Sequence, residues 1–352
     1  MDRKAPRLGR ALLVGTLGLL VLLGAGHALL WHAAAGQLEA GWQDWVRLRR
    51  GQGWRVEHAP PVTGGWPLAV TLGVDRLRLD GGAATLPGGI ALSAEKVVLR
   101  VRLPWLDRLL IELPGQQRLR LGDTEFPFVA DTLSAVVPLD AGTLPSTAEI
   151  AAERLRLGTP AGGVEVRSLR LGAKGSASAT EEEPVLSLAL TANGVQLPAA
   201  PPGRAGQVFG RRMEQVAADL SLSGPMPPAR DPVQRAAAWR DGGGTLEVRS
   251  LSLQWGPMSA TAAATMALDE RLQPMGAGTL RLSGAQAALD ALAEAGLVAG
   301  RPVQMARAVL PLLSRPTADG GSEIEVPLTL DDRMLLLARI PVLRLPPLEW
   351  PR

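Results

Sequence analysis

The stretch from Ala11 to Trp31, which reads ALLVGTLGLLVLLGAGHALLW, constrains this chain more than any other feature. It contains no Asp, Glu, Lys or Arg over 21 residues. An α-helix of this length extends roughly 30 Å, which matches the hydrocarbon thickness of a bilayer. We therefore predict a transmembrane helix over residues 11–31, preceded by a short basic segment over residues 1–10.

Basic residues precede this helix. They are Arg3, Lys4, Arg7 and Arg10. The first acidic residue after the helix is Glu39. Because positively charged flanks tend to stay in the cytoplasm, we expect a cytoplasmic N-terminus. This orientation places the bulk of the chain in the periplasm, and we expect a single pass through the inner membrane.

The residues after the helix allow two interpretations. Ala33-Ala34-Ala35 fits the small-x-small rule for signal peptidase, so cleavage after Ala35 is the alternative to an uncleaved anchor. The apolar core of a secretory signal is usually about 7–15 residues, and this one is longer. We therefore favour an uncleaved signal anchor.

An amphipathic helical continuation is predicted over residues 32–53. Leu38, Trp42 and Trp45 fall at helical spacing on one face, and Gly51 or Gly53 would end the helix. The two tryptophans could contact lipid headgroups or pack on the folded body, and we favour packing.

From Trp54 onward the apolar residues recur with a period of two. Short alternating runs are separated by turn residues, and the chain contains 40 Gly and 29 Pro. This pattern is typical of antiparallel strands. It predicts a mainly β fold with a few helices, in which an extended or curled antiparallel sheet forms a groove or a sandwich. Register changes are expected after Asp75-Arg76 and at Arg167-Ser168.

Proline-rich sequence near residues 198–210 suggests a division of the body. We predict a first β-rich half over residues 54–200, a second over 201–340, and a proline-rich tail over 341–352. Helices are expected near 231–240, where Asp231-Pro232 supplies an N-cap and a first-turn proline, and near 285–297 and 303–313.

Several classes of site are excluded by composition. The chain has no cysteine, and His58 is the one histidine of three that lies beyond the apolar helix, since His27 and His32 lie in or beside it. Thiol chemistry and a histidine-rich metal site are therefore excluded. A net charge of +3 does not indicate nucleic-acid binding. No hydrolase, metalloprotease or nucleotide-binding motif is present.

The remaining candidate carboxylates are typical of solvated turns and loops. They are Asp219, the pair Asp331-Asp332 and the run Glu181-Glu182-Glu183. We therefore expect no catalytic residue, no metal site, no cofactor and no enzymatic activity.

Several segments together resemble an envelope family catalogued as domain of unknown function 2125. Besides the anchor and its continuation, they are Gly65-Trp66-Pro67, Leu113–Leu121, Leu253–Pro257, Leu268–Gly284, Val326–Leu330 and Leu345–Leu348. The most specific is LDERLQPMGAGTLRLSG, which carries the motif positions Leu268, Gln273, Pro274, Gly276 and Gly284. In Gly65-Trp66-Pro67 the family's usual aromatic is Phe. There we expect Gly65 to form a turn, Trp66 to fix the strand in the core, and Pro67 to block edge pairing.

This family is similar in style to the AsmA-like envelope proteins. Those look like membrane-tethered β-grooves associated with moving or organising lipids, and the resemblance carries no catalytic residues. It implies a non-enzymatic groove that holds or passes acyl chains, with membrane lipid as its partner. The alternatives are a β-sandwich with a filled core, a structural partner of an envelope protein complex that docks through the tail, and an envelope hydrolase using His58 or Asp331.

Overall fold

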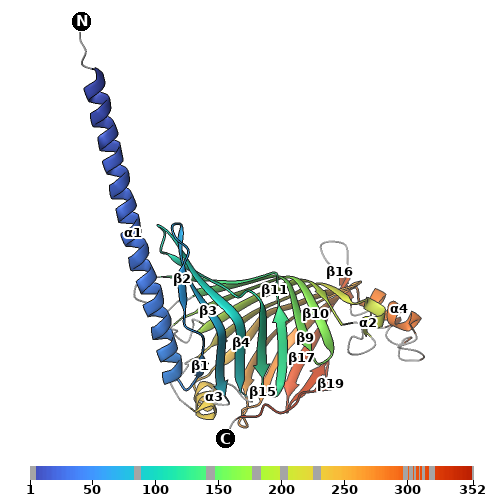
Figure 1. The fold of residues 1–352 in the computed structure, drawn as a ribbon. Coiled ribbons are helices and arrows are strands. Elements are labelled where there is room, and N and C mark those ends of the chain that lie inside the picture. The colour runs from blue at the N-terminus through green and yellow to red at the C-terminus, as the bar shows by residue number, and fades with distance from the viewer. Residues whose placement is uncertain are drawn as a thin grey trace.

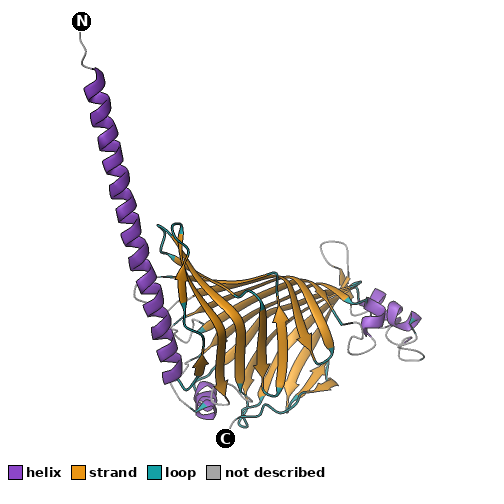
Figure 2. Cartoon of the chain, viewed as in Figure 1, coloured by secondary structure: helices purple, strands orange, loops and turns teal. Residues whose placement is uncertain are grey.

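A long helix leads into one large, curled antiparallel sheet (Figure 1). The computed structural model describes residues 5–82, 89–139, 147–176, 184–198, 205–224, 231–295, 314–316 and 322–350, with the single positions 300, 304, 307, 308 and 310. Within these ranges, nineteen strands belong to a single sheet, which confirms the predicted mainly β fold. The sheet is groove-like rather than flat, as Figure 2 shows.

Helix α1 (Ala5–Gly51) spans 47 residues, or roughly 70 Å at 1.5 Å per residue. By its length and apolar composition α1 could cross a membrane, and it ends at Gly51 as predicted. Its N-terminal half stands clear of the sheet, whereas its C-terminal half lies along it (Figure 1). Of the predicted helices, 231–240 is confirmed as α3 (Pro232–Asp241), with Asp231 at the N-cap.

The first part of the sheet runs from residue 55 to residue 196. Its strands are β1 (Arg55–Glu57), β2 (Val62–Gly64), β3 (Ala69–Gly82), β4 (Ile90–Arg102), β5 (Arg108–Glu112), β6 (Gln116–Leu121), β7 (Thr124–Val129), β8 (Thr132–Pro138), β9 (Thr147–Thr159), β10 (Gly162–Gly175) and β11 (Leu186–Gln196).

The second part adds the remaining strands and two further helices. They are α2 (Ala205–Phe209), β12 (Arg212–Ser223), β13 (Thr245–Trp255), β14 (Met258–Leu268), β15 (Pro274–Ser283), α4 (Ala285–Glu294), β16 (Ser314–Pro316), β17 (Ser322–Asp331), β18 (Met334–Leu337) and β19 (Ile340–Arg344). Most of the predicted helix at 303–313, and the end of the one at 285–297, lie outside the described residues.

Strand pairing follows a path from β1 and β2, which both pair with β3, to β19. β4 pairs with β3, β5 and β6, and two short branches, β5–β8 and β6–β7, rejoin at β9. From β9 to β15 consecutive strands pair, and β15 pairs with β17. Because β11 pairs along β12, the two predicted halves share one sheet.

Apolar side chains of neighbouring strands lie opposite one another. Leu72 of β3 is opposite Leu99 of β4, which is opposite Ile111 of β5. The same alignment recurs across β11, β12 and β13 through Leu188, Leu220 and Val248. Because side chains alternate between the faces of a strand, these registers collect the apolar residues on one face, which we call the apolar face.

At both predicted positions the apolar alternation changes parity within a continuous strand, but the pairing register is the same on either side, so the predicted register changes are wrong. Arg76 of β3 has a φ of 54°, and the pairing with β4 passes over it. Arg154 of β9 has a φ of 49°, and the pairing of β9 with β10 passes over Arg154 and Arg167. Each irregularity lets the apolar residues on both sides of it stay on the apolar face.

The turn before β3 differs from its prediction. Gly65 adopts a φ of 91°, which favours glycine, but Trp66 is 53% exposed and Leu68 is 77% exposed. The expectation that Trp66 fixes the strand in the core is therefore wrong, and β3 begins at Ala69 rather than at Trp66. The physical reason is that α1 offers the Trp66 ring an alternative packing surface outside the core.

Candidate functional site

An apolar cavity of about 650 Å³ lies between α1 and the apolar face of β3, β4 and β5. A volume of this size is within the range of small-molecule pockets, roughly 300–1,000 Å³. Gln37 adds a polar group to an otherwise largely apolar wall. The α1 side consists of Ala34, Gln37, Leu38, Gly41, Trp42 and Trp45, and the sheet side includes Leu77, Leu79, Leu92, Val97, Leu99, Val101, Leu109, Ile111 and Leu113.

Helix α1 is held over this face by buried side chains. Trp42 is 7% exposed and packs in one cluster with Leu72 and Val74 of β3. Its ring stacks on Trp45 at a centroid distance of 5.2 Å and meets the edge of His58 at 5.3 Å. The prediction that these tryptophans pack on the body is confirmed. One wall of the cavity is therefore a fixed part of the fold.

Ala34 and Ala35 have a packing role of their own. Both are buried in a second cluster with Val70 of β3 and Leu103. Their small side chains let the helix backbone approach the sheet closely. The same small residues that fit the signal-peptidase rule are thus required for the contact between α1 and the sheet.

The apolar face continues away from the cavity, and among the described residues no helix as long as α1 covers it there. Along β10 to β15 a small cluster of Val166, Ala192 and Val195 is buried, whereas most leucines of the face are only half-buried. The half-buried leucines are Leu169, Leu171, Leu188, Leu190, Leu220, Leu253 and Leu280. A filled core would bury such side chains completely. The geometry is therefore that of an open apolar groove.

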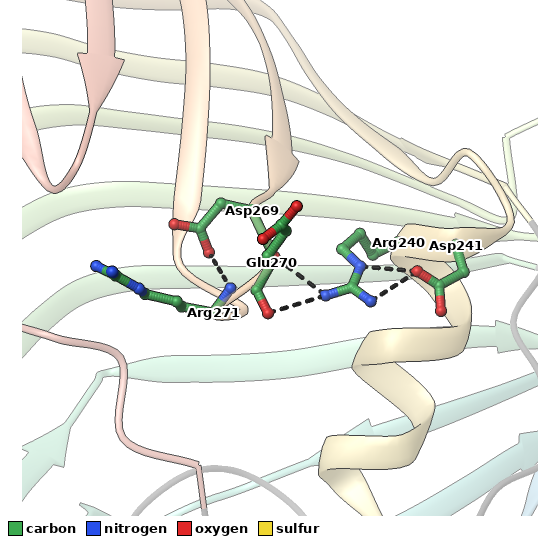
Figure 3. A network of polar contacts seen from close by, with 5 residues as sticks. All are labelled: Arg240, Asp241, Asp269, Glu270 and Arg271. Atoms are coloured by element: carbon green, nitrogen blue, oxygen red, sulfur yellow. Dashed lines mark hydrogen bonds and ion pairs between the residues drawn. The ribbon is translucent and has the colours of Figure 1, made fainter.

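The most specific family block, residues 268–284, contains β15 and the turn between β14 and β15, part of which Figure 3 shows. The carboxylate of Asp269 accepts hydrogen bonds from the backbone N–H groups of Arg271 (2.8 Å) and Gln273 (2.7 Å). Arg240 of α3 donates to the backbone carbonyls of Asp269 (3.3 Å) and Glu270 (3.1 Å), and also binds Asp241. The turn is therefore tied to α3.

The same turn binds the C-terminal tail. The side chain of Gln273 donates to the carbonyl of Leu348 at 3.1 Å and accepts from its N–H at 2.8 Å. The indole N–H of Trp350 donates to the carbonyl of Leu272 at 3.0 Å. Gln273 therefore has a structural role that its place in the family block did not specify.

Two glycines of the block are required by close contacts. Gly284 has a φ of 72° and precedes α4, and a Cβ there would collide with the carbonyl oxygen of Pro257. A Cβ on Gly276 would collide with the backbone of Thr265 in β14. Leu268 and Pro274 form the first pair of the β14–β15 ladder. These positions shape the sheet rather than a reactive centre.

Replacing Gln273 by alanine is expected to release the tail. Two hydrogen bonds to Leu348 are lost, each contributing about 0.5–1.5 kcal/mol net. Tryptic cleavage after Arg344, followed by mass spectrometry, should therefore become several-fold faster. Gln254→Ala on the exposed side of β13 serves as the control, and equal cleavage rates in the two variants would contradict this role of Gln273.

The remaining candidate residues are dispersed. The ring of His58 contacts Trp42, and Asp219 lies 3.6 Å from Arg249. Asp331 is the exposed last residue of β17, and Asp332 lies in the exposed turn that follows it. The structure does not bring them together, and Glu181-Glu182-Glu183 lies outside the described residues. Within the described ranges, no group of three or more His, Asp or Glu could hold a metal ion.

Comparison with known proteins assigns the family. A bacterial family described as an uncharacterized protein conserved in bacteria, DUF2125, matches residues 31–346. The chain belongs to the DUF2125 family. The DUF2125 match begins at Trp31 near the end of the apolar stretch and includes the cavity, the whole described sheet and the β14–β15 turn. No curated protein and no solved structure matches the chain.

One contact was missed by the sequence analysis. The turn Gly65-Trp66-Pro67 binds α1 through His27 and Trp31, which are four residues apart at the end of the apolar stretch. The sequence offered one indication of this contact: His27 and Trp31 carry the two amphipathic rings of a segment whose other residues are mostly small or aliphatic, and their spacing places them on one face of the helix. It indicated a contact but not its partner.

Proposed function

We propose that α1 anchors this protein in the inner membrane, with its basic N-terminus in the cytoplasm and the sheet in the periplasm. The proposal is supported by the length and hydropathy of α1 and by the basic residues before it. The packing of Ala34 and Ala35 favours an uncleaved anchor. N-terminal sequencing of the membrane-bound protein should yield residues preceding Ala11, whereas a new terminus at Gly36 would contradict it.

The proposed function is non-enzymatic binding of lipid acyl chains in the apolar groove. The single observation that carries it is the cavity between α1 and the apolar face, which is apolar, about 650 Å³ in volume and beside the anchor. Acyl chains match such a surface because burial of apolar area, at about 25 cal/mol per Å², drives their transfer from water. Membrane lipid beside the anchor is the source of the ligand.

Titration with the fluorescent fatty acid cis-parinaric acid tests this function. The full chain is held in a fluorinated surfactant, which mixes poorly with hydrocarbon chains and so competes weakly. Binding near Trp42 and Trp45 should give saturable energy transfer from tryptophan to parinarate. A signal that rises linearly without saturation would contradict a defined acyl-chain site.

A second candidate function is docking to an envelope protein partner. β19 pairs with β18, and its side chains are exposed, including Ile340 (67%), Val342 (56%) and Leu343 (52%). An exposed apolar edge strand can add a strand from another chain. Residues 345–350 of the predicted docking tail bind the protein's own β14–β15 turn through Gln273 and Leu272, so β19 is the more suitable surface.

Replacing Val342 by lysine should abolish capture of such a partner in a pull-down with the full chain, whereas unchanged capture would contradict docking at β19.

A further inference from the structure

Two adjacent loops at one end of the sheet expose large apolar side chains. The turn before β3 carries Trp66 (53% exposed) and Leu68 (77%), and the segment after β4 carries Trp105 (71%). The loops touch, because the N–H of Leu103 donates to the carbonyl of Leu68 at 3.0 Å. We call Trp66, Leu68 and Trp105 the aromatic rim.

The aromatic rim is fixed to α1 at the end of its apolar stretch. The Nε2–H of His27 donates to the carbonyl of Pro67 (2.7 Å), and the indole N–H of Trp31 donates to that of Ala69 (2.8 Å). The ring of Trp66 lies 5.4 Å from that of His27 and 5.8 Å from that of Trp31. The end of β2 accordingly rises alongside α1 above the rest of the sheet (Figure 1).

The level of these contacts relates the rim to a bilayer. Leu29, between His27 and Trp31, is 72% exposed and continues the exposed apolar surface of α1. If α1 spans the membrane, residues 27–31 lie where hydrocarbon gives way to headgroups. Trp side chains are enriched at that level because their rings are apolar and their N–H is polar.

We propose that the aromatic rim is a second membrane contact, which inserts into the interfacial region of the leaflet next to the sheet. Its occupant is phospholipid bilayer, since the rim continues the lipid-facing surface of α1. Arg102 lies beside the rim, because it is opposite Ala69 in the β3–β4 ladder. Its exposed side chain supplies a cation for headgroup phosphate.

This contact has a consequence for the cavity. Leu106, next to Trp105, lines the apolar cavity, so a rim seated in the leaflet places that wall of the cavity at the bilayer surface. The inference rests on the proposed position of α1 in the membrane and is independent of any ligand in the groove.

The absence of cysteine from the chain allows a direct test. Single variants Leu68→Cys and Trp105→Cys are labelled with a nitroxide in the full chain, reconstituted into phosphatidylethanolamine–phosphatidylglycerol vesicles. Collision rates with oxygen, which partitions into lipid, are compared with those for a water-soluble nickel chelate. Leu20→Cys in the apolar stretch (60% exposed) is the lipid reference, and Thr261→Cys on the exposed side of β14 is the aqueous reference.

Labels at positions 68 and 105 should resemble the lipid reference, with oxygen collisions exceeding nickel collisions. Nickel accessibility like that at position 261, or protection from both reagents as in a protein interface, would overturn the proposal. An aqueous label at position 20 would overturn the anchor and the rim together. Without labels, replacement of both Trp66 and Trp105 by Phe should reduce tryptophan quenching by lipids brominated near the glycerol, whereas unchanged quenching contradicts insertion.

Discussion

Replacement of Leu109 by glutamate is expected to weaken the binding of cis-parinaric acid to the full chain at least tenfold. Leu109 is half-buried, lies opposite Val101 and Val137, and lines the cavity. A carboxylate there would have to lose water when an acyl chain enters, and the tenfold change corresponds to about 1.4 kcal/mol. Titration of the variant with cis-parinaric acid, followed by energy transfer from tryptophan, measures this effect.

The neighbouring Leu110 provides a matched control. It is also a half-buried leucine of β5, but it lies opposite Arg100 on the other face of the strand. Leu110→Glu introduces the same charge beside a cation and should leave parinarate binding unchanged. Equal losses in both variants would show that the charge acts through folding rather than through the groove.

Truncation of Trp42 to alanine should lower the free energy of unfolding by about 3–5 kcal/mol, the usual cost of removing a large aromatic from a core. The Trp42 side chain joins α1 to β3 and contacts Trp45 and His58. The variant opens the cavity wall and leaves space that the neighbouring side chains fill only in part. Denaturant titration of the full chain in detergent, followed by circular dichroism of the β signal, gives the change.

Leu48 is the corresponding control on the same helix. It is 51% exposed, so Leu48→Ala should change the unfolding free energy by less than about 0.5 kcal/mol. Similar midpoints for Trp42→Ala and Leu48→Ala would contradict the view that α1 is part of the folded core.

Local patterns were sufficient to predict much of the fold. The absence of charge over residues 11–31 and the helical spacing of Leu38, Trp42 and Trp45 predicted α1 up to Gly51. Alternation with period two predicted the strands, and Asp231-Pro232 predicted the start of α3. Each of these features depends on residues close in sequence, which is why they could be inferred from one chain.

Contacts between residues distant in sequence could not be predicted from local patterns. Trp66 was expected in the core because it begins an alternating apolar run, yet its ring packs against His27 and Trp31, more than 30 residues away. Gln273 binds Leu348 across 75 residues, and no local pattern specifies that pair. For the groove, alternation predicted one apolar face, but a filled core and an open surface have the same pattern. The half-burial of most leucines along β10 to β15, outside the buried cluster of Val166, Ala192 and Val195, distinguishes the two.

Photocrosslinking in a bilayer tests the central claim most directly. The full chain is placed in nanodiscs with a phospholipid that carries a diazirine near the end of one acyl chain, irradiated, digested and mapped by mass spectrometry. An acyl-chain groove predicts crosslinks to cavity residues of β4 and β5, such as Leu99 and Ile111, in addition to those along the exposed apolar part of α1. Crosslinks confined to α1 and the aromatic rim would contradict it.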